Sequence, residues 1–172
     1  MVGTGKLANA ALIALACALA SPATAPAGEP DSGHTHGVNA RGDRAMGFSH
    51  MRTTHHFRLL PDGGAIEVTA NDFADTVSRN MIRAHLTRIA RMFAAGDFSA
   101  PMLIHDRVPP GVPDLQRLKS KVRYVYEPIA NGGRVLISTR NAGGLVAIHE
   151  FLRFQITDHK TGDPLEVMDV PR

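Results

Sequence analysis

The chain has 172 residues, of which 44% are hydrophobic and 20% are charged, a composition typical of a folded globular protein rather than of a disordered or fibrous one. Its single cysteine excludes a scaffold stapled by disulfides and a zinc site built from several thiolates. The 19 Lys and Arg residues outnumber the 16 Asp and Glu residues only slightly and are dispersed along the chain, so we expect no nucleic-acid partner.

The first residues predict a secretory signal peptide over residues 1–27. Lys6 precedes an apolar run over residues 8–20, and small residues with Ala-x-Ala spacing follow it. This run is shorter than the roughly 20 residues that a membrane span needs. We therefore expect a periplasmic or secreted protein, without a transmembrane segment after cleavage within residues 20–28. The alternative is a lipoprotein anchored at Cys17.

The segment after the signal peptide shows no apolar periodicity. Residues 28–45 are therefore predicted to form a flexible tether, and residues 46–172 a single domain. His34 and His36 in this tether are expected to be solvated.

An internal repeat organises the domain. Asp62-Gly63-Gly64 and Asn131-Gly132-Gly133 are both hairpin signals, because these residue types accept a positive φ. An alternating strand pattern and then an amphipathic helical pattern follow each signal. Repeat 1 spans about residues 55–97 and repeat 2 about residues 124–163. The predicted fold class is α+β, with duplicated ββα units that form one antiparallel sheet, helices packed on one face, and pseudo-twofold symmetry.

A linker over residues 98–123 joins the two repeats. Its first part, Phe98–Pro113, contains four prolines and is predicted to lack regular structure. A short helix is expected over Asp114–Lys121, before the third strand.

Histidine and methionine are the candidate ligand residues. Imidazole suits copper, zinc and nickel, and thioether suits Cu(I), so a thiol-free exported protein would bind copper or zinc through these side chains. The first predicted strand contains two adjacent histidines, the first helix contains one histidine flanked by methionines, and the linker contains one histidine. The candidate metal residues are His55, His56, His85, His105, Met81 and Met92.

These candidates do not all fit one site. Adjacent strand residues point to opposite faces, so His55 and His56 cannot serve the same ion, and His55 with His85 is the expected pair. In the alternative interpretation, His55 is a hydrogen-bonded core histidine and His56 faces solvent. In one interpretation His105, which precedes Asp106, is a ligand or a general base. In the other, the apolar residues before it hold the linker to the core and His105 has no role of its own.

One short segment resembles an enzyme motif. Ser138-Thr139-Arg140 is similar to part of the Ser-Thr-Arg-Thr phosphate-binding segment of aspartate and ornithine carbamoyltransferases. Those enzymes contain two α/β domains, whereas this chain has about half their length and no parallel-sheet pattern. The segment therefore does not indicate carbamoyl transfer.

A longer set of motifs resembles an uncharacterised family of small exported bacterial proteins. The resemblance rests on Thr53-Thr54-His55-His56-Phe57, Gly63–Asp72, Ile104-His105-Asp106 and Phe151–Gln155, and covers about residues 46–163. Some members carry an aspartate carbamoyltransferase label, which the residues here do not support. Members of the family often have Asp-Gln where this chain has Ser49-His50. The resemblance therefore argues against His50 as an essential ligand, but not against His55 or His56.

Three classes of function remain. The first is a small periplasmic binding protein for a transition metal such as copper. The second is a metal-free module that binds a small ligand or a protein partner through the uncovered sheet face. The third and least favoured is an enzyme, with His55, His56 and His105 as its acid–base set. Each class is compatible with a monomer or an oligomer.

Overall fold

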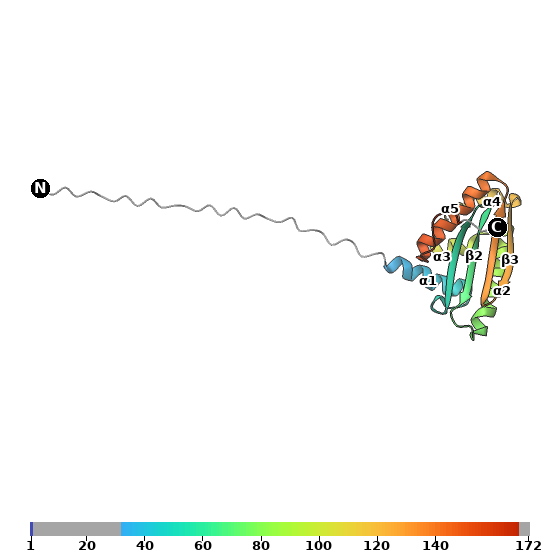
Figure 1. Ribbon diagram of the computed structural model, residues 1–172, viewed down its shortest axis with the longest axis horizontal. Coiled ribbons are helices and arrows are strands. Elements are labelled where there is room, and N and C mark those ends of the chain that lie inside the picture. The colour runs from blue at the N-terminus through green and yellow to red at the C-terminus, as the bar shows by residue number, and fades with distance from the viewer. Residues whose placement is uncertain (2–31, 169–172) are drawn as a thin grey trace. The chain divides into compact units, whose positions relative to one another are not determined.

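The computed structural model describes Met1 and residues 32–168 (Figure 1). Apart from Met1, the predicted signal peptide and residues 28–31 of the predicted tether lie outside the described residues. The elements are α1 (Ser32–Met46), η1 (His50–Arg52), β1 (Thr53–Leu60), β2 (Gly63–Ala70), α2 (Thr76–Ala94), α3 (Ser99–His105), α4 (Val112–Arg117), η2 (Lys119–Lys121), β3 (Val122–Ile129), β4 (Gly132–Thr139) and α5 (Ala142–His159).

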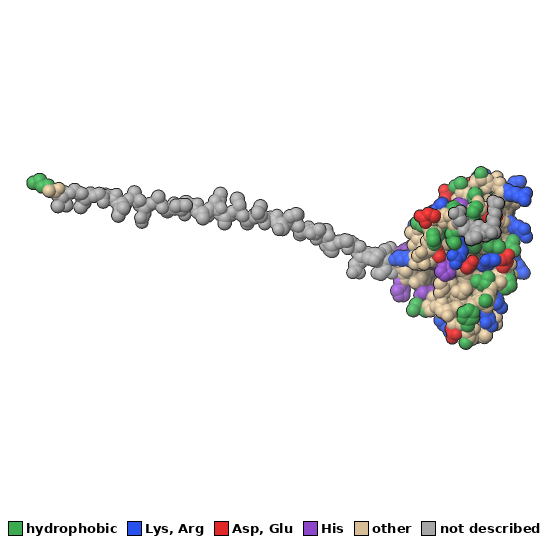
Figure 2. Space-filling model, viewed as in Figure 1, with side chains coloured by type: hydrophobic (Ala, Val, Ile, Leu, Met, Phe, Trp, Pro, Cys, Tyr) green, Lys and Arg blue, Asp and Glu red, His purple; other side chains and the backbone are tan. Residues whose placement is uncertain are grey.

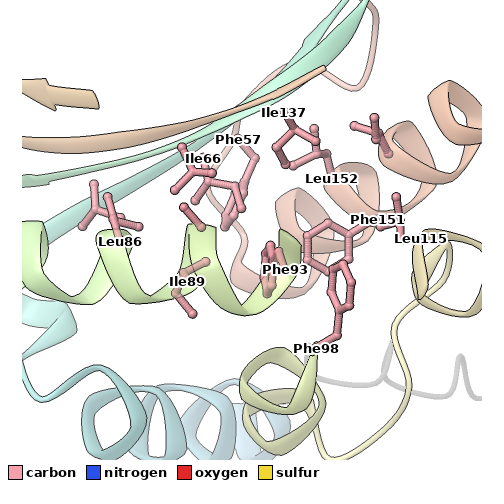
Figure 3. Packing of buried hydrophobic residues seen from close by; sticks show 14 of the residues in the cluster. Phe57, Ile66, Leu86, Ile89, Phe93, Phe98, Leu115, Ile137, Phe151 and Leu152 are labelled. Carbon is pink, nitrogen blue, oxygen red and sulfur yellow. The ribbon is translucent and has the colours of Figure 1, made fainter. Parts of the chain in front are cut away.

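The four strands form one antiparallel sheet in the order β1-β2-β4-β3, and α2 and α5 pack on one face of it (Figures 1 and 3). This confirms the predicted α+β class. Each hairpin is followed by a long helix, as expected from the repeat, whereas an origin by duplication and pseudo-twofold symmetry stay predictions. Within the described residues, no helix is long and apolar enough to cross a membrane.

Both hairpins occur where they were predicted, but their glycines have another role. Leu60 pairs with Gly63, so the turn itself consists of Pro61 and Asp62. Gly63 and Gly132 belong to the central strands β2 and β4, and a Cβ on either one would lie 1.9 Å from a backbone oxygen of the neighbouring strand. Glycine is therefore required at these positions by the close approach of two strands.

The predicted tether is wrong for residues 32–45, because they form most of helix α1. The helix buries a single large apolar residue, Val38, which is 1% exposed. Polar contacts hold it in addition: the Arg41 Nε donates to the Ile104 carbonyl over 2.7 Å, and the His34 Nε2 lies 2.9 Å from the Asp158 Oδ1. A helix with so narrow an apolar face gives little periodic signal.

The expectation of an irregular segment over Phe98–Pro113 is also wrong, since α3 and the start of α4 lie within it. Pro101 and Pro113 both fall in the first turn of a short helix, where the missing N–H has no intrahelical acceptor to lose. The short helix expected over Asp114–Lys121 is replaced by α4 and the 3₁₀ turn η2.

The core lies between the sheet and the two long helices (Figure 3). The apolar side of the amphipathic pattern in α2, Ile82, Leu86, Ile89 and Phe93, is buried there. The rings of Phe93, Phe98 and Phe151 pack together with centroids 4.4 to 5.9 Å apart. These aromatic side chains fill one end of the layer, toward α4. Histidine side chains occupy the other part of the layer, near α1, and form the candidate site described below.

Replacing Gly111 with Ala should destabilise the protein by at least about 3 kcal/mol. Gly111 has a φ of +78°, and an added Cβ would lie 2.2 Å from the Ala147 carbonyl oxygen in α5. Gly162 is the matched control, because its φ is +76° but no heavy atom of the described residues lies within 4 Å of an added Cβ. Gly162→Ala should cost about 1–2 kcal/mol in urea unfolding. Equal losses for the two variants would contradict the close approach of Gly111 to α5.

Candidate functional site: a histidine-lined pocket

Four histidine side chains, each from a different element, line one inner cavity of about 70 Å³. His55 points inward from β1, since it shares a sheet face with the buried Phe57. His85 lies on the buried face of α2. His105 and His159 are the last residues of α3 and α5, so two helix C-termini deliver their rings to the same place.

The rings form a row across this layer. His55 and His159 are parallel, with an interplanar angle of 1° and centroids 6.1 Å apart. His159 contacts His105 edge to face at 4.9 Å. On the other side, the buried Phe48 bridges His55 and His85, with centroid distances of 6.4 and 5.7 Å. Four imidazoles therefore line one cavity without converging on a single point.

A second, outer cavity of about 250 Å³ adjoins the first. The two share Met46, His55 and His159 as lining residues. Val38 and Gly42 of α1 form one wall of the outer cavity, and Figure 2 shows histidine side chains at the surface where α1 lies. The helix that replaces the predicted tether is therefore part of the pocket.

His105 is the most firmly held of the four histidines. It is 2% exposed, its Nδ1 lies 2.6 Å from the Asp158 Oδ2, and its Nε2 lies 3.0 Å from the Gln155 Oε1. Asp158 also accepts from Arg107 over 3.0 Å. Burial alone would raise the pKa of Asp158, but hydrogen bonds from His105 and His34 outweigh it and lower that pKa below its usual range.

The other three imidazoles are neutral near pH 7. Burial, together with the nearby His56 and His50, lowers the pKa of His55 to about 4. Burial and the neighbouring Arg88 lower the pKa of His85 to about 4. Burial and the adjacent His105 lower the pKa of His159 to about 3. Each of these rings therefore offers one hydrogen-bond donor and one acceptor rather than a positive charge.

The structure brings together only part of the predicted residue set. His55, His85 and His105 line the inner cavity. His56 lies on the opposite strand face, with its Nδ1 2.8 Å from the Asp163 Oδ1, which agrees with the predicted separation from His55. Met81 is 40% exposed and Met92 packs against the core, and neither is among the residues that line the two cavities.

The arrangement of ligand-type side chains bears on the metal hypothesis. Across residues 32–168, no group of three or more His, Cys, Asp or Glu side chains is placed to hold a metal ion. His105 contributes to this absence, because both of its ring nitrogens already have protein partners.

Sequence reasoning missed three residues of this site: His159, Gln155 and Asp158. A signal existed, because Leu152, Gln155 and His159 recur at helical spacing along the buried face of α5. The contact between α5 and β1 is not visible in the sequence, since it joins segments about 100 residues apart.

The sheet face away from the helices has a different character. Ion pairs join Arg58 to Glu67 at 3.5 Å, and Arg134 to Glu67 and Glu127 at 3.9 and 2.8 Å. The segment that resembles a phosphate-binding motif has a structural role at the end of β4, since the Thr139 hydroxyl donates to the Lys121 carbonyl and accepts from the Asn141 N–H.

The lowered histidine pKa values predict that the protein loses stability as the pH falls from about 6.5 toward 4. In this window the unfolded chain binds protons that the folded pocket excludes, so each buried histidine costs at most about 1.4 kcal/mol per pH unit. Replacing His55 or His159 with Gln should flatten the dependence between pH 7.5 and 5.0 in urea unfolding. His36→Gln, at an exposed position of α1, is the control. An unchanged slope in both pocket variants would contradict the burial of neutral imidazoles.

Comparison of the chain with models of protein families, with curated proteins and with solved structures gave no match. The chemistry of the histidine-lined pocket therefore has to be inferred from its own residues.

Proposed function

We propose that this protein is a small exported binding protein that holds a small uncharged ligand in the histidine-lined pocket. The observation that carries the proposal is the pair of adjoining cavities, whose shared wall includes His55 and His159. Export is part of the proposal and rests on the predicted signal peptide over residues 1–27.

The size of the pocket supports a ligand of about one ring. The inner cavity measures about 70 Å³ and the outer one about 250 Å³. Sites for drug-sized ligands span about 300–1,000 Å³, whereas an apolar cavity of about 150 Å³ takes benzene. A monocyclic compound therefore fits the outer cavity and can extend one substituent toward the inner one.

The lining supports an uncharged ligand. The inner cavity is walled by apolar core side chains, including Phe57, Leu86 and Phe151, and its polar groups are mainly imidazoles that carry no charge near pH 7. A buried charge without a partner is strongly unfavourable, so a carboxylate or an ammonium group is disfavoured there. A neutral imidazole can still exchange hydrogen bonds with a hydroxyl or carbonyl group.

A transition metal is the weaker candidate, although imidazole is a good ligand for copper and zinc. Tight sites need three or four ligand atoms within about 2.0–2.3 Å of one point. The described residues provide no such group, and the row of rings would have to rearrange to create one.

Phenol should bind to the protein, purified without a histidine tag, with an affinity at least about tenfold higher than that of benzoate, because only benzoate brings a charge into the pocket. Binding is measured by the imidazole ring signals of ¹³C- and ¹⁵N-labelled protein, and the signals of His55 and His159 should shift on phenol addition. His159→Leu should weaken phenol binding, while His36→Ala should leave it unchanged.

Two results would overturn this proposal. The first is phenol binding that leaves the pocket histidine signals unshifted, or no phenol binding at all. The second is submicromolar binding of Zn²⁺ that His55→Ala and His85→Ala each abolish, which would establish the metal interpretation instead.

Export is tested separately. Fusing residues 1–30 to a reporter enzyme that is active only in the periplasm should give activity, because the apolar run and the small residues after it direct secretion. The mature protein should begin between Ser21 and Gly28. Retention of the complete N-terminus on protein isolated from its native cells would contradict export by cleavage.

A further inference from the structure

We propose that the side-chain amide of Gln155 is the recognition group of this pocket, and that the ligand presents to it an oxygen that accepts a hydrogen bond, as a ketone or amide carbonyl does. This inference rests on the proposed function, since it assigns a chemical class to the ligand of the same pocket.

Gln155 occupies a central place in the site. It lies on α5 one turn before His159, is 4% exposed, and lines the inner cavity together with His105 and His159. Its Oε1 lies 3.0 Å from the His105 Nε2. Its Nε2, in contrast, has no hydrogen-bond partner within the described part of the chain.

The amide of Gln155 points its oxygen toward His105. The Asp158 carboxylate can only accept, so the His105 Nδ1, at 2.6 Å, donates to it. The amide oxygen of Gln155 faces the other ring nitrogen, His105 Nε2, at 3.0 Å. The NH₂ group of Gln155 therefore lies on the side away from the ring and is left for another acceptor.

The surroundings of Gln155 favour a ligand oxygen as the acceptor for its NH₂ group. The inner cavity is otherwise walled at this end by apolar side chains such as Ile104 and Phe151. A buried N–H group without a partner costs free energy, and an oxygen that accepts from it recovers that cost on binding. The amide thus favours a ligand that carries an acceptor over a hydrocarbon of the same shape.

The charge balance of the site selects an uncharged acceptor. The His105 ring and the Arg107 guanidinium already pair with the same carboxylate, that of Asp158. The pKa of His159 is lowered to about 3, so this ring supplies no cation for an anionic ligand. A carbonyl oxygen satisfies the Gln155 amide without bringing a net charge into the cavity.

Acetophenone and ethylbenzene test this inference, because they have nearly the same shape and differ in the carbonyl oxygen. The ratio of their affinities is measured by calorimetry on the whole exported protein. Gln155→Met removes the amide at similar side-chain length, and should reduce the preference for acetophenone about threefold to tenfold, the usual loss for one neutral hydrogen bond. Gln116→Met, at an exposed glutamine of α4, should leave the ratio unchanged.

Gln155→Glu is a second variant that keeps an acceptor for His105 but replaces the free donor by a carboxylate oxygen. It should disfavour acetophenone relative to ethylbenzene at least as strongly as Gln155→Met does. Infrared spectroscopy gives a measurement that needs no variant. The carbonyl stretch of acetophenone bound to the wild-type protein should lie at lower frequency than in hexane, because a hydrogen bond weakens the C=O bond.

The outcomes separate this inference from the proposed function. If neither probe binds in the pocket, the proposed function fails and this inference fails with it. If both probes bind, but the affinity ratio is unchanged in Gln155→Met and the carbonyl stretch equals that in hexane, the pocket binds ligands and recognition by Gln155 is wrong. Where a variant does not fold, the infrared result on the wild-type protein decides.

Discussion

The buried carboxylate of Asp158 is the interaction on which the arrangement around the pocket depends. It is 8% exposed and lies next to the last residue of α5, where the helix dipole disfavours a negative charge. Three donors from outside α5 compensate for this, since His105, Arg107 and His34 all lie within 3.0 Å of its oxygens. The bonds from His105 and His34 lower its pKa despite its burial. One carboxylate therefore ties α1, α3 and the segment after α3 to the end of α5.

This network explains why α1 is ordered although its apolar face is narrow. Val38 alone contributes a large buried apolar side chain, so the hydrophobic stabilisation of the helix is small. The hydrogen bond between His34 and Asp158 and the bond from Arg41 to the Ile104 carbonyl fix the helix against α3 and α5. Because α1 forms a wall of the outer cavity, the shape of the pocket depends on polar contacts that hydrophobic periodicity does not reveal.

The parts of the fold that follow from local patterns could be predicted from the sequence. The alternation in β1 and β2 and the stripe Ile82, Leu86, Ile89 and Phe93 depend on neighbouring residues only, and these elements are where they were expected. Helices α1 and α3 could not be predicted in this way, because tertiary contacts stabilise them against a weak or proline-containing local sequence.

The sequence predicted several residues of the candidate site, but not which side chains they contact. His55, His85 and His105 attract attention because buried imidazoles are uncommon, and all three do line the cavity. Met81 does not line the two cavities, because a residue on the flank of a helical stripe can turn either to the core or to solvent, and here it is 40% exposed. Gln155 and Asp158 acquire their roles from His105, which lies about 50 residues earlier in the chain.

The same hydrogen-bond chain links the architecture to recognition. Asp158 accepts a hydrogen bond from the His105 Nδ1, the His105 Nε2 faces the Gln155 Oε1, and the Gln155 NH₂ group lies on the side away from the ring. Asp158, which holds α1 and α3 against α5, thus also holds His105 beside Gln155 in the wall of the inner cavity. The neutral histidines beside it make the wall polar without adding charge. A metal site would need these rings gathered around one point, whereas here they are distributed along the wall. A pocket with a fixed amide donor and neutral imidazole walls is suited to a polar but uncharged molecule.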